Sequence, residues 1–297
     1  MRDHREHRDH RLERLSGPSV RSWKGADQPG SEQMASNVAL DCGWGRLIFG
    51  QTFETPQALA KSLLQESPGR RDIGFYIRDP HVVLSLAPDR LFLDPSHAYR
   101  LWLDRYRPAK RPKAGFVIRR AASSTDFEEL QRIYALRHMV HPSLEFLREN
   151  RRSRTLTYFL AEDKSEHGIL GSIMGVDHVH AINDPENGSS FWCLAVDPLC
   201  ARPGVGEGLV RFVIEHYMAR GRSFVDLSVM HDNEEAIALY DKMGFERAPV
   251  FTVKRKNPIN EPLFIAPDVA PDLNPYARLI VDEARRRGIT VEILDEP

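Results

Sequence analysis

The sequence lacks the features that mark several large classes of protein. None of its 297 residues belong to an apolar run of about 18 residues or more, and no short apolar stretch of the secretory type opens the chain. It has only three cysteines, Cys42, Cys193 and Cys200, without paired spacing, which excludes a disulfide framework or a zinc ribbon. We therefore expect a cytoplasmic protein that has no membrane contact and needs no metal.

An excess of charge of one sign is also missing. The chain has 41 Lys and Arg against 42 Asp and Glu, a net charge of -1, so its overall charge gives no reason to expect nucleic acid or an acidic membrane as a partner. The hydrophobic share of 41% is ordinary for a globular protein. At about 100–200 residues per domain, the length predicts two domains.

Composition divides the chain into four segments. Residues 1–35 are predicted to be a disordered polar tail, because charged residues, Gly, Pro and Ser dominate there. Residues 36–113 are predicted to be an α/β extension that ends in a basic, proline-interrupted linker, and residues 114–257 the main domain. Residues 258–297, with a helical pattern over 273–287 and a strand pattern over 289–294, are typical of the start of another α/β domain.

The extension shows alternating strand and helix signals. Thr55 and Pro56 are typical of a helix start, so a helix is predicted over 56–64. Strands are predicted over 46–53, 72–78 and 81–86. In the main domain the same reasoning predicts strands over 116–119, 156–160, 168–179, 191–196, 224–229 and 250–253, and helices that begin near 124, 205 and 233.

A glycine-rich turn follows the apolar strand over 191–196. Gly204, Gly206 and Gly208 have no Cβ, so backbone N–H groups at the start of the next helix can approach a pyrophosphate closely. The turn is neither a P-loop, which needs Gly-Lys-Ser/Thr, nor a G-x-G-x-x-G dinucleotide motif. Taken alone, these glycines could equally serve close packing between helix and strand.

Together with its neighbours the turn is more specific. The order Leu194-Ala-Val-Asp-Pro198, Gly204-Val-Gly206, Asn233 to Tyr240, and Gly244-Phe245 resembles the GNAT superfamily of N-acetyltransferases. The resemblance implies an α/β fold with a mixed central sheet that splays between two parallel strands. It departs from the family at Ala201, where Gln or Arg is usual, although Arg202 stands beside it.

The resemblance also implies a co-substrate and a mechanism, in which a substrate amine attacks the thioester of acetyl-CoA directly. Backbone groups of Leu194 and Val196 would hold the pantetheine arm, and Tyr240 would be the general acid, although it could instead be only a core aromatic. Asn233 would contact CoA or only cap its helix. The pyrophosphate would be held by the residues of the turn, namely Arg202, Gly204, Val205, Gly206, Glu207 and Gly208.

The general base is less clear from the sequence. Lysine-acetylating relatives often have a Glu where this chain has Ser190. His178 and His180 are predicted to share one face of a strand near the active-site end, which makes His178 a candidate base. A histidine that only flanks a turn is an equal alternative, and an α-amine needs little help to lose its proton.

The whole chain is similar to the acetyltransferase region of N-acetylglutaminylglutamine synthetases, through Asp41 to Phe49, Arg71 to Tyr76 and Asp94 to His97. In that family an ATP-grasp ligase follows, so the resemblance implies such a domain or partner here. It also implies a small-molecule substrate, the α-amine of glutamine or of a glutaminyl dipeptide. Two alternatives are a protein or peptide N-acetyltransferase and a non-catalytic CoA-binding module of a ligase.

Overall fold

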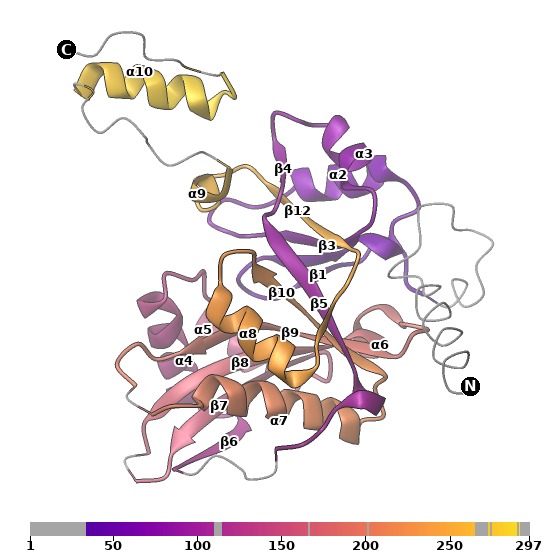
Figure 1. Cartoon of the computed structure of the whole chain (residues 1–297), viewed down its shortest axis with the longest axis vertical. Coiled ribbons are helices and arrows are strands. Elements are labelled where there is room, and N and C mark those ends of the chain that lie inside the picture. The colour runs from indigo at the N-terminus through magenta and orange to yellow at the C-terminus, as the bar shows by residue number, and fades with distance from the viewer. Residues whose placement is uncertain are drawn as a thin grey trace, which may run out of the picture.

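Two β-sheets form the framework of the protein in a computed structural model, shown in Figure 1. The structure describes residues 34–109, 115–165, 167–200, 202–264, 273, 275–289 and 291. The predicted tail over 1–35 and the predicted strand over 289–294 therefore lie almost wholly outside the described residues. One sheet has five strands in the order β1-β2-β3-β12-β4, and the other has seven in the order β11-β5-β10-β9-β8-β7-β6.

The smaller unit comes mainly from the N-terminal extension. It contains β1 (Ala39–Asp41), β2 (Arg46–Phe49), the 3-10 turn η3 (Gly50–Thr52), α2 (Pro56–Leu64), β3 (Ile73–Ile77), α3 (Pro80–Ser85) and β4 (Leu91–Leu93). The helix over 56–64 is confirmed, with the Thr55 side chain accepting from the Ala58 amide at 3.2 Å. The strand predicted over 81–86 is wrong. Pro80 at the first turn fixes a helical φ, and α3 forms there instead.

The larger unit contains most of the remaining elements. Its order along the chain is β5 (Ser96–Trp102), η4 (Leu103–Arg105), β6 (Phe116–Arg120), α4 (Ser124–Leu136), α5 (Leu144–Asn150), β7 (Leu156–Asp163), β8 (Ile169–Asp177), α6 (His178–Ile182), β9 (Gly188–Val196), α7 (Val205–Ala219), β10 (Phe224–Met230), α8 (Glu234–Met243) and β11 (Glu246–Arg247). The strand predicted over 168–179 runs two residues too far at its C-terminal end, because α6 begins at His178.

The two units exchange one strand each. β5 follows the extension but lies in the larger sheet, antiparallel to β10 from Phe224↔Trp102 to Met230↔Ser96. In return β12 (Phe251–Arg255), which follows the main domain, lies in the smaller sheet between β3 and β4. Figure 1 shows both strands crossing from one unit to the other. Neither sheet is complete without the other unit.

The same sequence of elements occurs twice. In the extension, β2 is followed by α2, the parallel strand β3, α3, the short strand β4 and the exchanged strand β5. In the main domain, β9 is followed by α7, the parallel strand β10, α8, the short strand β11 and the exchanged strand β12. The chain is therefore built on a repeated β-α-β-α-β-β topology whose last strands are swapped.

The larger sheet has a distinct core on each face. α7 and α8 cover one face, with Val205, Leu209, Val213 and Tyr240 buried against β9 and β10. The other face packs against α4, α5 and the β2–β3 edge of the smaller unit, in one continuous core. The strands β9 and β10 thus lie between the helices of one face and the extension on the other.

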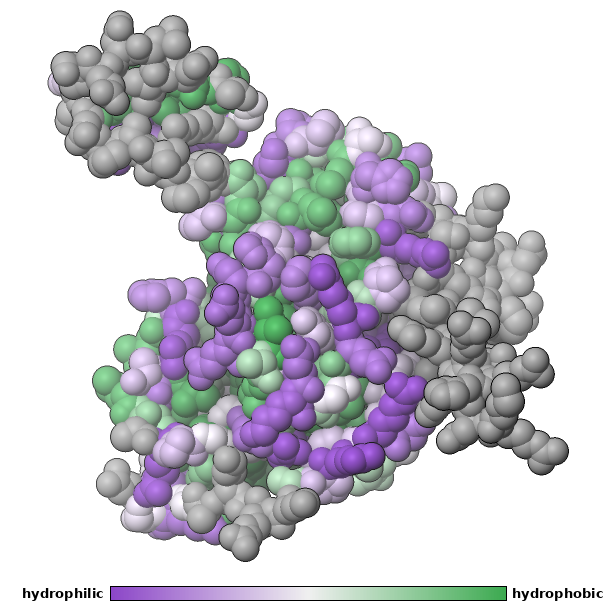
Figure 2. All heavy atoms as spheres, in the orientation of Figure 1, coloured by the Kyte–Doolittle hydropathy of each residue, from purple (hydrophilic) through white to green (hydrophobic). Residues whose placement is uncertain are grey.

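The C-terminal part continues as α9 (Glu261–Phe264) and α10 (Pro275–Arg286), and α10 matches the helix predicted over 273–287. Figure 1 shows α10 apart from both sheets. Figure 2 shows hydrophilic residues over much of the α7 and α8 side, with hydrophobic residues gathered on the smaller unit near α9. In the described part of the chain, no helix has the length and apolar character to cross a bilayer.

Candidate active site

The strands β9 and β10 are paired at their beginnings and then diverge. Their parallel register runs only from Phe224↔Gly188 to Asp226↔Ser190, whereas β9 continues to Val196. Cys193 has a left-handed φ of 52°, and the register of β9 with β8 shifts beside it, which marks a β-bulge. The bulge bends β9 away from β10, and the half-buried Leu194 and Val196 lie beyond it. The splayed pair predicted from the sequence is present.

The glycine turn leads from the end of β9 into α7. Gly204 has a φ of 82° and is the N-cap of α7, a conformation that favours glycine. A Cβ on Gly206 would meet only Val196 Cγ2, at 3.7 Å, so the backbone there is open on one side. The first intrahelical bond runs from the Gly208 amide to the Gly204 carbonyl at 2.9 Å. The amides of Val205 and Gly206 therefore precede the helix ladder and can bind an anion.

Gly208 has a different structural role from Gly204 and Gly206. Its amide belongs to the helix ladder, and a Cβ there would lie 2.8 Å from Phe116 Cε2 on β6. Gly208 therefore lets α7 pack closely against β6, and its predicted contact with the pyrophosphate stays a prediction.

The two charged side chains of the turn are engaged with protein groups. Arg202 forms an ion pair with Asp163 at the end of β7 and donates to Ser165 Oγ at 3.0 Å. Glu207 lies 2.9 Å from Arg211 and 3.3 Å from Lys242. Burial acts to raise the pKa of Glu207, but the bonds from these two cations hold it below its usual value. Glu207 thus ties α7 to α8.

A cation that the sequence reading missed lies nearby. Arg137, which follows α4, donates from Nε to the Val196 carbonyl at 2.7 Å. It therefore stands at the end of β9, a few residues before the glycine turn. Nothing in its local sequence singles it out, because α4 is more than fifty residues away in the chain.

Tyr240 lies on α8 and faces the diverging strands. Its ring packs against Phe191 on β9 at 5.9 Å and against Phe245 at 5.6 Å. Burial raises the pKa of its hydroxyl well above the usual value, so the group stays protonated at neutral pH. Asn233 begins the same helix, and its Oδ1 accepts from the Ala236 amide at 3.2 Å, which confirms the cap.

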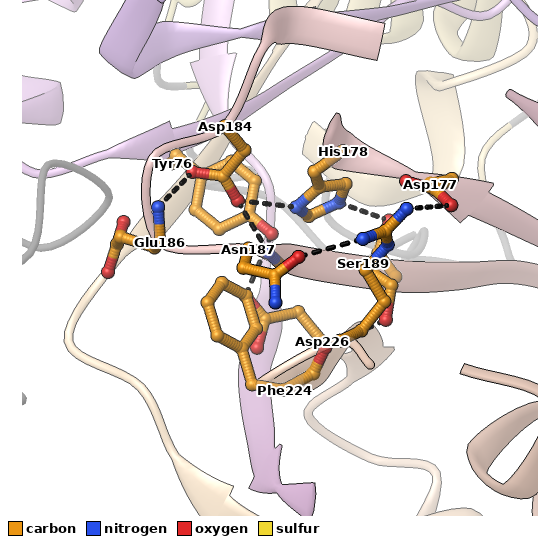
Figure 3. A network of polar contacts seen from close by, with 12 residues as sticks. Tyr76, Asp177, His178, Asp184, Glu186, Asn187, Ser189, Phe224 and Asp226 are labelled. Atoms are coloured by element: carbon orange, nitrogen blue, oxygen red, sulfur yellow. Dashed lines mark hydrogen bonds and ion pairs between the residues drawn. The ribbon is translucent and has the colours of Figure 1, made fainter. Parts of the chain in front are cut away.

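His178 is buried in a polar network on the extension side of the sheet, shown in Figure 3. Its Nε2 lies 2.9 Å from Ser190 Oγ and its Nδ1 lies 3.7 Å from Asp184 Oδ2. Ser190 Oγ also accepts from Trp192 Nε1 at 2.9 Å. The Asp184, His178 and Ser190 side chains thus form a line that ends where β9 and β10 diverge.

The expectation that His178 and His180 share a strand face is wrong. Both belong to α6, capped by Asp177, and neighbours two apart on a helix point in different directions. His178 is buried, whereas His180 is exposed. Figure 3 also shows how α6 is fixed: buried Asp177 accepts from Arg222 at 2.9 Å, and Arg222 in turn donates to Asn187 at 2.8 Å.

A second polar network, formed partly by the extension, reaches the place where the pairing of β9 and β10 ends. Tyr76 at the end of β3 has a φ of 62° and donates from its hydroxyl to Asp226 Oδ2 at 2.7 Å. Arg100 on β5 holds the same carboxylate with two bonds of 2.8 Å, and its guanidinium lies 3.5 Å from the centroid of the Phe224 ring. The sequence reading missed these residues because three distant segments supply them.

Comparison with known proteins agrees with this geometry. The family model "Acetyltransferase (GNAT) family" matches residues 124–245. A mycothiol acetyltransferase from Saccharomonospora viridis is 29% identical over 177 residues, which cover 55% of each chain. The [ribosomal protein bS18]-alanine N-acetyltransferase of Escherichia coli K12 is 39% identical over 62 residues, covering 21% of this chain and 42% of the relative. The chain thus spans about half the length of the curated relatives it matches.

A solved structure agrees at the level of the fold. A GNAT-family structure from Novosphingobium aromaticivorans superposes with a TM-score of 0.51 at 18% identity, over 82% of this chain and 99% of the other. Within the described residues, no group of His, Cys, Asp or Glu is placed to hold a metal ion. The splayed strands, the glycine turn and the family match agree, and residues 124–245 resemble an acetyltransferase domain of the GNAT family in sequence and in fold.

Proposed function

We propose that the chain is an acetyl-CoA-dependent N-acetyltransferase that acetylates the α-amine of a small molecule of the glutamine or glutaminylglutamine type. The observation that carries the proposal is the divergence of β9 and β10 beyond Ser190, which ends at the open turn of Gly204 and Gly206. A strand gap bordered by unpaired backbone and a helix N-terminus suits a ligand that has an amide-bearing arm and a pyrophosphate.

The residues of this region fit CoA. Leu194 and Val196 border the gap, and the amides of Val205 and Gly206 precede the ladder of α7. Acetyl-CoA, when bound, would supply an acetyl group activated as a thioester, and CoA thiol would be the leaving group. Asn233 is exposed at the start of α8, so its amide group is also available to the ligand, although its Oδ1 caps the helix.

Side chains of the protein could transfer the two protons of the reaction, one to the leaving sulfur and one from the attacking amine. Tyr240, protonated because of its burial, would donate a proton to the leaving sulfur. His178 would accept the proton of the amine, through Ser190 Oγ or a water. Asp184 would orient the imidazole, since its Oδ2 lies 3.7 Å from Nδ1. The two groups border the same part of β9 from opposite faces of the sheet, since Tyr240 packs on Phe191 and His178 lies beside Ser190.

The choice of substrate rests on the resemblance to N-acetylglutaminylglutamine synthetases. The segments that carry it, around Asp41 to Phe49 and Arg71 to Tyr76, pack against the side of β9 that bears Trp192 and Cys193. They therefore border the side from which an amine would approach. By the same resemblance, an ATP-grasp ligase domain or partner would consume the acetylated product.

A second candidate is acetylation of a peptide N-terminus. It is favoured by the similarity to the alanine N-acetyltransferase that acts on ribosomal protein bS18. An α-amine is the acceptor in both cases, so the catalytic residues do not separate the two candidates.

One assay separates them. The protein is mixed with acetyl-CoA and a panel of amines, and release of free CoA thiol is followed. We expect turnover with L-glutamine or glutaminylglutamine and little with peptides that begin with alanine. Turnover on peptides alone would favour the second candidate. CoA binding without turnover on any amine would indicate a non-catalytic CoA-binding module.

A further inference from the structure

We propose that Trp44 and Arg71 form a binding site for a carboxylate of the acceptor substrate. The acceptor would then be a free α-amino acid rather than the N-terminus of a peptide. This inference rests on the proposed function for the identity of the ligand, but the site itself rests on contacts in the extension.

Trp44 and Arg71 are held together beside the acetyl-transfer region. The Arg71 amide donates to the Trp44 carbonyl at 3.1 Å, just before β2 and β3 begin. A Cβ on the intervening Gly45 would lie 2.2 Å from the Arg71 carbonyl oxygen, so the two segments touch through backbone. Any residue other than glycine would push them apart.

This corner faces the bulge in β9. Phe75 on β3 meets Trp192 edge to face at 5.1 Å, which fixes β3 against the bulged strand. Cys193 lies at the bulge. Burial raises the pKa of the Cys193 thiol to about 12, and the positive charge of the Arg71 guanidinium acts to lower this pKa. Arg71 therefore lies close to the point where β9 turns away from β10.

Two hydrogen-bond donors at this corner are buried without a partner. Trp44 is only 3% exposed, and its Nε1 donates to no atom of the described residues. The Nε of Arg71 is likewise buried and unpaired within the part of the chain that is described. Buried donors without acceptors are destabilising, and they are rare unless a ligand or water completes them. Both atoms would be satisfied by an acceptor group on a ligand.

The acidic residues nearby already have partners. Asp72 pairs with Arg46 at 2.5 Å, Asp94 pairs with Lys254 at 2.8 Å, and Glu66 accepts from Asn257 at 2.6 Å. Lys254 is itself affected by Arg71. Burial is the main cause that lowers the pKa of Lys254 to about 8, and the charge of Arg71 adds to it. Within the described residues, these three carboxylates pair with groups other than Arg71, which leaves its guanidinium available to an anionic ligand.

The chemistry of the two donors selects a carboxylate. A guanidinium binds a carboxylate through parallel N–H bonds, and an indole N–H can add a third. A free amino acid has its carboxylate one carbon from the amine, whereas a long peptide has an amide there. The corner would therefore recognise the small acceptor and reject a protein N-terminus.

Binding can be measured without turnover. Calorimetric titration of L-glutamine and of L-glutamine amide into the full chain, with CoA present, compares ligands that differ only in the carboxylate. We expect L-glutamine to bind at least about tenfold more tightly than the amide, since bonds to charged groups are strong. Arg71→Gln should remove this difference without changing the affinity for the amide, and Arg71→Lys should keep part of it.

Trp44→Phe supplies a second, gentler variant, because it removes Nε1 but keeps most of the buried ring. It should weaken binding of L-glutamine several-fold and leave CoA affinity unchanged, with thermal unfolding as the check on folding. Equal affinity for acid and amide, equal loss of both in Arg71→Gln, or no binding of either would overturn the carboxylate site. Selective binding of L-glutamine without acetyl transfer would instead contradict the proposed function and leave the site standing.

Discussion

The Tyr240 hydroxyl combines protonation with a position beside the diverging strands. Since burial raises its pKa, the hydroxyl can donate a proton at neutral pH but accepts one poorly. We expect Tyr240→Phe to lower kcat by about 10²-fold or more, which is typical for the loss of a general acid, while the Kd for CoA changes little. Steady-state kinetics and calorimetry check the two quantities. Unchanged kcat in this variant would rule out the acid role.

His178 should affect a different step. Its imidazole lies between Ser190 and Asp184, with Nε2 2.9 Å from Ser190 Oγ and Nδ1 3.7 Å from Asp184 Oδ2. We expect His178→Gln to lower kcat at pH 7 by about 10²-fold, within the range for a lost general base. The deficit should shrink as the pH rises above the pKa of the acceptor amine, because the amine then loses its proton without help.

A pH–rate profile of wild type and variant measures this. Asp184→Asn is the matched variant, since it keeps the shape of the side chain but removes the charge beside Nδ1. A deficit that stays constant from pH 7 to pH 10 would show that His178 only supports the structure.

Local motifs account for the site residues that the sequence predicted. Tyr240 and Asn233 stand at fixed positions on one helix, and Gly204 and Gly206 on one turn, so the resemblance to a family could assign them from short local motifs. Asp184 lies in a segment that reads only as a turn. Tyr76 reaches Asp226 across 150 positions of the chain, a contact that no local pattern indicates.

At the scale of elements, the start of α7 depends on the absence of side chains. A Cβ added to Gly206 would lie 3.7 Å from Val196 Cγ2. This leaves room for a methyl group but not for a long acidic side chain directed at a phosphate. We expect Gly206→Glu to weaken CoA binding by at least about 10²-fold through lost space and charge repulsion. Calorimetry measures the affinity. Gly206→Ala is the control and should keep most of it, and equal affinity in the Glu variant would place the pyrophosphate elsewhere.

The capping box of α4 provides a test of stability against pH. Burial acts to raise the pKa of Asp126, but bonds from Arg119 and from the Ala122 and Ser123 amides hold it well below its usual value. A carboxyl whose pKa is lowered by folding stabilises the protein fully above its unfolded pKa of about 3.9, and the contribution is lost as the pH falls towards the folded value.

We therefore expect Asp126→Asn to lower the free energy of unfolding by about 1–2 kcal/mol at pH 7, as for other lost caps. The difference from wild type should narrow below about pH 4, where the carboxyl of the unfolded chain is protonated. Denaturant titrations at several pH values measure this difference in the free energy of unfolding. Glu128→Gln, at an exposed acid of the same helix, is the control and should have little effect at any pH. A loss of stability in Asp126→Asn that does not depend on pH would contradict the role of the charged Asp126 carboxylate in capping α4.

Elements were predicted well where caps and periodicity agree, and poorly where they conflict. Thr55 and Pro56 mark the start of α2 clearly. Over 81–86, Val82 and Val83 favour a strand, but Pro80 starts a helix that packs on α2 and β12. At α6 the apolar alternation of β8 continues past Asp177, although the side chain of Asp177 caps a helix there. In both cases a local helix-start signal prevailed over the strand pattern.

At the scale of the whole molecule, the exchange of β5 and β12 joins the extension to the acetyltransferase domain. The family match over 124–245 includes neither strand. Sequence reading expected a boundary near residue 113 and treated the extension as a neighbour that packs against the domain. Strand order depends on contacts between distant segments, so periodicity could not indicate that each unit supplies a strand to the other. The extension copy of the repeated topology has only Gly50 where the main domain has its glycine turn.

The exchange predicts that the acetyltransferase domain does not fold alone. A chain of residues 115–255 would expose the long edge of β10, which β5 covers from Ser96 to Trp102, and would leave β12 without β3 and β4. An exposed edge strand favours aggregation. We expect this chain to lack a cooperative thermal transition by circular dichroism, whereas residues 34–264 should unfold cooperatively near the temperature of the full chain. Adding residues 34–109 as a separate polypeptide should restore part of the transition. A cooperative, monomeric fold of 115–255 alone would show that the exchanged strands are dispensable.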